Sequence, residues 1–467
     1  MRILKTYLLN CMFHGWAFVA DDRYHWTERL FWIINIIASW YLAGMFMMNS
    51  YYQFENDSVS FTVDTLYLNW TTKFPAIIFC EKGNEKYHQF ADQWFKPDRN
   101  FDTDEVIKDI AFFKGAFDGI TYKCMQQSLH LQCPPSRYTY MTVVEGVRSS
   151  CSELFGHCTW REEEFDCCSY FLPLNTIYGV CYAINSIATH SPTCKNRTQM
   201  EIPSTGKLSV STISVELLHP NVKIFTLSSE EVPTYNSETS KLVFDGISVS
   251  PHLNEENHIL LRVEDTVNEP EVESLSIEKR NCRYPNENYL QTSKVYSYPA
   301  CIIQCLKNIH LNSCNCTHHL MPSATIQEMC DLDGLFCLSS KFSAHLQESS
   351  ECTCLSSCIE SKISILGHIV YQDFRSFKNK KSTTKINFTL YPPAIRYIRK
   401  IITGYLDLIV YMGGLAGLFA GASVLTIVDF FYYFIVRPYN DARVKRQVLE
   451  PAINQIRKEH KHIPFRN

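Results

Sequence analysis

The sequence lacks the signatures of several common function classes. It has no basic block interleaved with aromatic residues, and its formal net charge is −4, so we expect no nucleic-acid partner. It contains no G-x-S-x-G motif, no H-E-x-x-H motif and no comparable nucleophile arrangement, which argues against an enzyme. It also has no internal repeat and no low-complexity segment. We therefore look for a non-enzymatic role that needs no cofactor.

Charge is also absent from two long apolar runs. Leu30–Met48 and Leu408–Val428 contain no Asp, Glu, Lys or Arg. Each has about the 20 residues that a helix needs to cross a bilayer. The first run is too long for a cleavable signal, and no small-residue cleavage site follows it. The sequence therefore predicts two membrane spans with one large loop between them.

These runs divide the chain into five segments. We expect a cytoplasmic N-terminus over 1–26, a first transmembrane helix over 27–50, a cysteine-rich extracellular domain over 51–400, a second transmembrane helix over 401–436, and a basic cytoplasmic tail over 437–467.

Cysteine placement indicates which side of the membrane the loop faces. Of the 20 cysteines, only Cys11 lies outside the stretch from Cys80 to Cys358. That concentration is typical of an oxidising compartment, and the paired C-x2-C spacing of many zinc sites is missing. We expect a disulfide framework that includes Cys80, Cys181, Cys282, Cys301, Cys305, Cys314, Cys316, Cys330, Cys337, Cys352, Cys354 and Cys358. Nineteen is odd, so one thiol is free or pairs with another chain, and Cys167-Cys168 is our candidate place for it.

Glycosylation motifs and basic residues support the same topology. N-x-S/T sequons in the loop are candidate glycan sites; they lie at Asn56, Asn69, Asn196, Asn315 and Asn387. After Val436 the tail carries eight Lys/Arg against three acids, and positive flanks stay in the cytoplasm. We expect a plasma-membrane protein with both termini inside. The basic tail is an ordinary topology signal, with contact to anionic lipid as the alternative.

The loop mixes strand and helix patterns. Ser209–Glu216, His258–Val263 and Ile363–Val370 are rich in β-branched residues, as strands are, whereas Ala300–Leu311 has helical spacing with Cys301 and Cys305 on one face. The polar stretch Pro251–Asn257 is interpreted as a turn. The fold class expected is a two-span α-helical membrane protein with a large disulfide-rich mixed α/β extracellular domain.

The second apolar run contains features that an anchor does not need. Gly413, Gly417 and Gly421 fall four apart, on one helical face, with Gly414 beside them. Small residues at this spacing allow helix backbones to pack closely, or they line a pathway where carbonyl oxygens replace the water around a cation. Asp407 and Asp429 flank the run, and they are either pore acids or solvated interfacial acids.

Short motifs along the chain occur in an order known from one family. They are Phe13-His14-Gly15, Trp26–Trp32, Lys73–Cys80, Gly179–Asn185, Ser228–Pro233, Lys279–Pro285, Tyr298–Cys316 and Gly421-Ala422-Ser423. Together they resemble the epithelial sodium channel/degenerin/acid-sensing channel family, and within it the insect pickpocket branch. The resemblance covers the chain from the N-terminal segment to the second span.

This resemblance implies a specific architecture. It implies a homo- or heterotrimer of related subunits whose second spans line a sodium-preferring pore, blocked in many members by amiloride-like drugs. Gly421, Ala422 and Ser423 match the selectivity filter, and Asp429 matches a frequent inner acid. His14 and Gly15 match a motif of the inner vestibule that influences opening. Sodium would be the permeant ion rather than a cofactor.

Two positions depart from the family pattern, and both bear on how the channel would open. Val410 falls where bulky side chains tend to hold such channels open, so we expect an open or leaky state. Tyr411 stands where acid-sensing relatives carry an acid, which argues against proton gating by the same coupling. The alternative function is a non-conducting regulatory or adhesion/receptor subunit; that reading explains the disulfides and sequons but not the glycines and acids of the second span.

Overall fold

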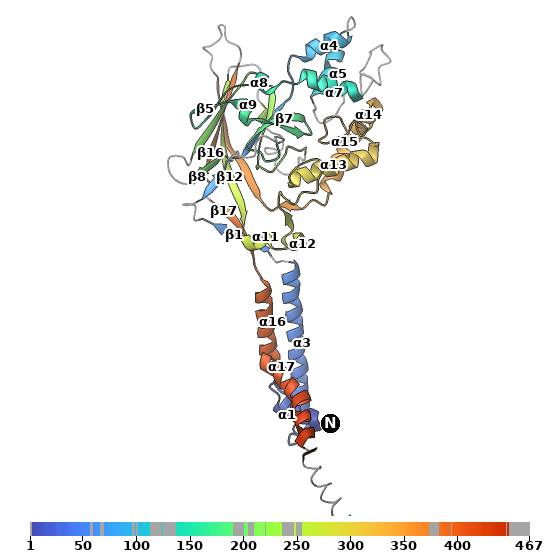
Figure 1. Cartoon of the computed structure of the whole chain (residues 1–467), viewed down its shortest axis with the longest axis vertical. Coiled ribbons are helices and arrows are strands. Elements are labelled where there is room, and N and C mark those ends of the chain that lie inside the picture. The colour runs from blue at the N-terminus through green and yellow to red at the C-terminus, as the bar shows by residue number, and fades with distance from the viewer. Residues whose placement is uncertain are drawn as a thin grey trace, which may run out of the picture. The chain divides into compact units, whose positions relative to one another are not determined.

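The chain folds into two compact units. One unit contains residues 1–60 and 401–467, and the other contains residues 61–400 (Figure 1). The structure is a computed structural model. The residues that it describes are 2–56, 59–65, 70–95, 99, 101–112, 124, 137–189, 200–203, 210–219, 221–235, 247–248, 255–372, 383–393, 395–444 and 446–447.

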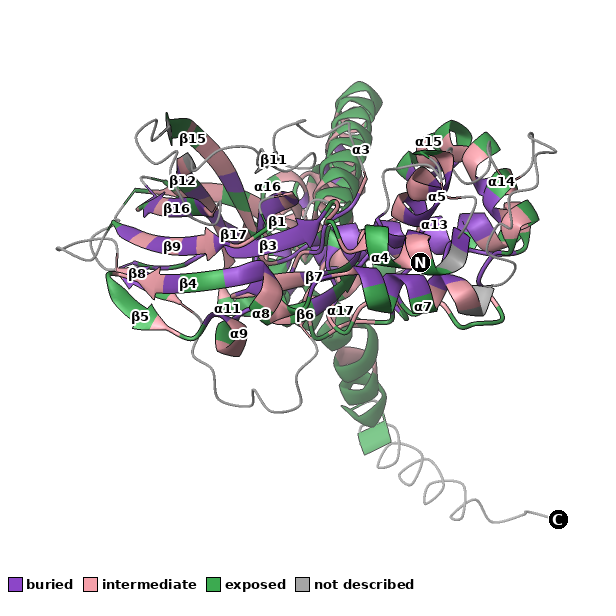
Figure 2. Cartoon of the chain, turned by 90° about the horizontal axis from the view of Figure 1, so that it is seen from above, coloured by how far each residue is buried: buried purple, intermediate pink, exposed green. Residues whose placement is uncertain are grey.

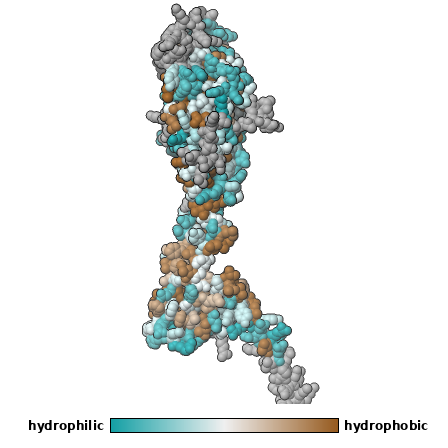
Figure 3. All heavy atoms as spheres, turned by 90° about the vertical axis from the view of Figure 1, so that its left-hand side faces the viewer, coloured by the Kyte–Doolittle hydropathy of each residue, from teal (hydrophilic) through white to brown (hydrophobic). Residues whose placement is uncertain are grey.

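The first unit is helical. Its helices are α1 (Arg2–Asn10), α2 (Trp16–Ala20), α3 (Trp26–Asn56), α16 (Tyr405–Ala420), α17 (Val424–Phe431) and the π-helical turn η3 (Tyr432–Val436). α3 contains the first apolar run and is long and apolar enough to cross a membrane. Its side chains are mostly exposed in the single chain (Figure 2), and apolar residues gather on the surface of these helices (Figure 3). Such a surface suits lipid or another subunit.

The second apolar run differs from the continuous helix expected over 401–436. α16 and the helical stretch from Val424 to Val444 are bent by 67° at the break between them. Taken together as one broken helix, they are long and apolar enough to cross a membrane. The helix that contains the first expected span is also longer than 27–50, because α3 runs over Trp26–Asn56.

The second unit is built on two β-sheets. The larger has the order β1-β17-β12-β16-β9-β4-β5, with β15 also paired to β12, and the smaller has the order β11-β10-β3-β7-β6. The strands of the larger are β1 (Val59–Asp64), β4 (Phe155–Trp160), β5 (Glu163–Phe165), β9 (Ser211–Leu217), β12 (Glu255–Asn268), β15 (Glu360–Gln372), β16 (Thr384–Tyr391) and β17 (Arg396–Ile401). Those of the smaller are β3 (Ala76–Glu81), β6 (Leu172–Thr176), β7 (Gly179–Ile184), β10 (Val222–Leu227) and β11 (Ile247–Ser248).

The main core lies between these sheets. The Phe79 ring of β3 meets the rings of Phe155, Phe171 and Phe388 at 5.2, 5.4 and 6.2 Å. Side chains alternate along a strand, so Ile77 and Phe79 enter this core while Ile78 and Cys80 enter a second one. β3 is buried on both faces, which explains why its sequence is a continuous apolar run rather than an alternating one.

Helices complete the second unit. They are α4 (Tyr87–Phe95), α5 (Phe101–Ala111), α7 (Arg137–Val147), α8 (Cys151–Leu154), α9 (Cys167–Tyr170), α11 (Pro270–Glu273), α12 (Ile277–Arg280), α13 (Tyr298–Cys314), α14 (Leu332–Ser340) and α15 (Phe342–Ser350). α13 contributes to the core on the outer face of the smaller sheet. Two small pairs join neighbouring segments, β2 (Thr71–Lys73) with β8 (Glu201–Pro203) and β13 (Cys282–Arg283) with β14 (Ser356–Ser357).

Disulfides tie α13 to its surroundings. The twelve framework cysteines form the pairs Cys80–Cys181, Cys282–Cys358, Cys301–Cys354, Cys305–Cys352, Cys314–Cys337 and Cys316–Cys330. Cys167 pairs with Cys158 and Cys168 with Cys151, so the extra thiol is not at Cys167-Cys168 as expected. Cys124 is also disulfide-bonded, and Cys133 and Cys194 fall outside the described residues.

Two further expectations need correction. The strands and the helix expected in the loop are confirmed by β9, β12, β15 and α13, but residues 255–257 of the expected turn begin β12. Asn387 lies buried in β16, where its amide nitrogen donates to Glu256 at 2.7 Å and its oxygen accepts from Ser214 at 2.5 Å. A glycan on this nitrogen does not fit the folded sheet. Asn56 and Asn315 are exposed, whereas Asn69 and Asn196 lie outside the described residues.

Candidate functional site

The candidate site is the break between α16 and α17, formed by Gly421-Ala422-Ser423. Gly421 has a φ of +70°, the left-handed conformation in which glycine is favoured and which commonly ends helices. Ser423 then begins α17, because its hydroxyl accepts a hydrogen bond from the Thr426 N–H at 3.3 Å. The Thr426 hydroxyl accepts in return from the Ser423 N–H at 2.9 Å. The sequence therefore stops one helix and starts another within three residues.

Ending α16 leaves carbonyl groups that need hydrogen-bond donors from elsewhere. The Phe419 carbonyl accepts from the Ser39 hydroxyl of α3 at 2.6 Å, and the Ala420 carbonyl accepts from the His14 N–H at 3.1 Å. The Phe419 ring also stacks on Phe46 of α3, with ring centroids 5.9 Å apart. The N-terminal segment and α3 thus supply hydrogen-bond donors to the last carbonyl groups of α16. Contacts between residues distant in the sequence therefore stabilise the break.

His14 and Gly421 pack closely. A Cβ atom added at Gly421 would lie 2.8 Å from His14 Cδ2 and 2.9 Å from the Met12 carbonyl oxygen. Gly15 is also left-handed, with a φ of +84°, and a Cβ there would lie 3.0 Å from Ile36 of α3. The structure therefore brings the His-Gly motif against the first residue of the candidate filter.

The N-terminal helix continues this contact along the second half of the broken span. Tyr7 of α1 is buried and meets Phe430, Tyr433 and Phe434, with ring centroids 5.9, 5.7 and 5.2 Å apart. Aromatic pairs in such edge-to-face contact contribute about 0.5–1.5 kcal/mol each beyond their area. These ring contacts join the N-terminal segment to α17 and η3.

The glycines do not form the single helical face expected. Gly421 lies outside α16, and a Cβ at Gly413 or Gly414 would meet no described atom within 4 Å apart from its chain neighbours and the backbone of its own helix. At Gly417 the nearest such contact is the Ala422 carbonyl oxygen, at 3.6 Å. Within the described chain, Gly413 and Gly414 serve no close helix contact, and their surface is open to a partner or to water.

The remaining candidate residues lie on α16 and α17. Asp407 accepts from the Gly404 N–H at 2.8 Å, as an acid in the first turn of a helix commonly does. Val410 and Tyr411 are exposed in the single chain, and Asp429 lies half-buried on α17. Gly421, His14 and Gly15 are therefore brought together, whereas Asp407, Val410 and Tyr411 are not part of that cluster.

The chemistry of the break is that of backbone and hydroxyl oxygens. Residues 421–423 are not helical, so some of their backbone groups do not take part in the hydrogen bonds that join each N–H of an α-helix to the carbonyl four residues earlier. Non-helical backbone within a membrane span is tolerated where it is buried in protein or lines a water-filled cavity. Among the described residues no group of three or more His, Cys, Asp or Glu is placed to hold a metal ion.

Comparison with known proteins decides the family. Residues 7–433 match the family described as amiloride-sensitive sodium channel. The chain belongs to that family. Its members are channels, not enzymes, and the chain is a membrane protein with two candidate spans flanking a disulfide-rich α/β domain.

Relatives in the family are distant in sequence but similar in length. The chain is 23% identical to sodium channel protein Nach of Drosophila ananassae, over 93% of this chain and 87% of the relative. It is 20% identical to pickpocket protein 28 of Drosophila melanogaster, over 97% of this chain and 82% of the relative. It is also 23% identical to the human bile acid-sensitive ion channel, over 93% and 86%.

Sequence reasoning missed three side chains that hold the site: Ser39, Thr426 and Tyr7. Thr426 could have been found, since Ser423 three residues before it forms a helix-start pattern. Ser39 and Tyr7 act through residues distant in the sequence, and a single sequence carries no signal for such contacts.

Proposed function

We propose that this chain is a pore-forming subunit of a sodium-selective cation channel of the plasma membrane. In this proposal three second spans, from copies of this chain or related subunits, surround the pore, and both termini are cytoplasmic. An extracellular stimulus gates the channel, or it is open at rest. Sodium passes down its gradient.

The observation that supports this function most is the break at Gly421-Ala422-Ser423. A cation leaving water needs oxygen ligands, and backbone carbonyls at an interrupted helix supply them. An anchor or adhesion subunit has no use for a glycine in the left-handed conformation inside its span, packed on a histidine from the N-terminal segment. Asp429 would add an acidic ring that attracts cations on the inner side of this constriction.

Recording currents tests the proposal. The chain is expressed alone and with related subunits, and sodium and potassium currents are measured with and without amiloride. Ser423→Ala removes the candidate filter hydroxyl and is expected to change the sodium/potassium permeability ratio several-fold. Thr426→Val removes the other half of the same helix start, a hydroxyl that lies 3.4 Å from the Gly421 carbonyl oxygen, and is the comparison variant. If Ser423 contacts ions, the shift in that ratio is expected to be smaller in Thr426→Val than in Ser423→Ala.

The outcomes separate the possible roles. Equal shifts in both variants would assign Ser423 to starting α17 rather than to contacting ions. A chain that reaches the surface with every related subunit and never changes the permeability of the complex would contradict the proposal, and would favour a non-conducting regulatory subunit.

Val410 gives a separate prediction about resting activity. Its side chain is 73% exposed on α16, at the position where the family resemblance associates bulk with open channels. Val410→Gly is therefore expected to lower the resting, unstimulated current of a conducting complex, measured at equal surface expression. Leu406→Gly, one helical turn earlier and 76% exposed, is the matched control. An undiminished current in Val410→Gly would refute the prediction.

A further inference from the structure

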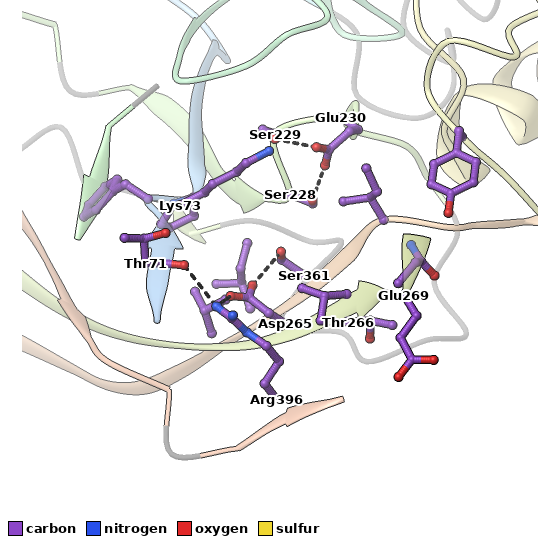
Figure 4. A pocket seen from close by; sticks show the side chains of 18 of the residues that line it. Thr71, Lys73, Ser228, Ser229, Glu230, Asp265, Thr266, Glu269, Ser361 and Arg396 are labelled. Atoms are coloured by element: carbon purple, nitrogen blue, oxygen red, sulfur yellow. Dashed lines mark hydrogen bonds and ion pairs between the residues drawn. The ribbon is translucent and has the colours of Figure 1, made fainter. Parts of the chain in front are cut away.

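The second unit contains a cavity that conduction does not use. It has a volume of about 340 Å³, within the range of small-molecule sites. Its walls come from β2, β12, β15, β17 and the turn that follows β10 (Figure 4). That turn, Ser228–Glu230, begins a motif noted in the sequence for which the proposed pore gives no role.

The polar wall of the cavity is rich in acids. Four acidic residues and two basic residues are among those that line it: Glu230, Asp265, Glu269, Glu273, Lys73 and Arg396. Arg396 is already engaged, because its guanidinium lies 3.5 Å from Asp265 and donates to the Thr71 carbonyl at 3.0 Å. Asp265 also accepts from the Ser361 hydroxyl at 2.8 Å. One basic residue, Lys73, remains to balance the other three acids.

Glu230 is the decisive group. It is only 3% exposed, and its carboxyl oxygens accept from the hydroxyls of Ser228 and Ser229 at 2.5 and 2.7 Å (Figure 4). Among the described residues, no Lys, Arg or His lies within ion-pair distance of it. A buried carboxylate without a positive partner is costly, so a bound cation would stabilise it.

The other residues of the wall indicate which kind of cation would fit the cavity. Apolar residues such as Phe74, Pro75, Val263 and Ile363 line the cavity beside the acids. We propose that the cavity binds a small organic amine, with its ammonium group at Glu230 and its apolar body against these residues. An ammonium ion donates up to three hydrogen bonds, and the carboxylate, with its two oxygens, can accept further ones.

Three probes of similar size and different charge test this directly. Phenethylamine, phenethyl alcohol and hydrocinnamate share a phenyl ring on a short chain and carry a positive, neutral and negative end. Binding to the purified full-length chain is measured by isothermal titration calorimetry at neutral pH. Phenethylamine is expected to bind at least tenfold more tightly than the other two.

Variants locate the site. Glu230→Gln is expected to weaken phenethylamine binding at least tenfold, whereas Glu264→Gln, the same change at a residue of β12 that does not line the cavity, leaves it unchanged. Lys73→Met removes the competing cation and is expected to tighten binding, a gain that misfolding cannot produce. Four outcomes would overturn the proposal. They are tighter binding of hydrocinnamate than of phenethylamine, equal binding of all three probes, no binding of any probe, and unchanged phenethylamine binding in Glu230→Gln. None of these measurements depends on ion conduction.

Discussion

Gly421→Ala is expected to reduce sodium current at least tenfold in a conducting complex. The substitution places a Cβ atom 2.9 Å from the Met12 carbonyl oxygen and 2.8 Å from the His14 ring, and it forces a non-glycine residue to a φ of +70°. The left-handed conformation alone costs about 1–2 kcal/mol for a residue with a Cβ. Because Met12 contributes a backbone atom, the contact is relieved only if the N-terminal segment moves away from the break.

Gly413→Ala is the matched control. A Cβ at Gly413 meets no described atom within 4 Å apart from its chain neighbours and the backbone of its own helix, and alanine favours a helix over glycine by about 1 kcal/mol. Current and surface labelling are measured for both variants, together with the melting temperature of each purified protein. We expect Gly421→Ala alone to lose current and melt earlier. Equal loss in both would instead indicate that the glycines act through close packing between subunits, and would remove the special role of the break.

The two spans, the strands and the cysteine-rich loop could be predicted because each rests on a local pattern. The break could not be seen in the same way, since Gly413, Gly417 and Gly421 have a spacing that also fits an uninterrupted helix. Glycine is nevertheless common just after the end of a helix, and serine is common just before the start of one. A glycine followed two residues later by a serine therefore indicates that one helix ends and another begins. Because Gly421 has a positive φ, this signal for a helix end decides against the continuous helix that the four-residue spacing of the glycines suggested.

Contacts between residues that are distant in the sequence could not be predicted from the sequence. The hydrogen bond from His14 to Ala420, the pairing of Cys167 and Cys168 and the burial of Asn387 depend on which segments the fold brings together. The family resemblance supplied the roles of His14 and Gly421 but not their contact. Similarly, the sequence around Glu230 gave a motif, whereas its burial beside a cavity is a property of the folded sheet.

Acidification is expected to destabilise the second unit, through buried histidines around α13. His310 lies 5.1 Å from His345 and 5.9 Å from His318 between ring centroids, and all three are buried. Burial, with His345 nearby, lowers the pKa of His310 to about 3. Burial likewise lowers the pKa of His319 to about 4, although its contact with the Ile110 carbonyl opposes this.

The sign of the effect follows from proton binding. Since the folded pKa lies below the unfolded value near 6.5, the unfolded chain binds more protons, and stability is lost as pH falls from 6.5 toward 3. For His310 alone the loss at pH 5 is about 2 kcal/mol by linkage. His310→Asn cannot protonate and retains a nitrogen near Thr317, whose hydroxyl lies 3.2 Å from His310 Nδ1. The variant should therefore lose less stability on acidification than the parent.

Melting of the purified chain between pH 7.5 and pH 5 measures this difference. His157→Asn is the control, because His157 is exposed beside Glu164 and its removal leaves the buried group intact. Equal acid losses in the parent and in His310→Asn would show that the buried histidines do not control the acid response. The result also bears on any current that changes with pH in this range, because unfolding of the second unit would then mimic gating by protons. A proton-gated response is credible only if it persists in His310→Asn.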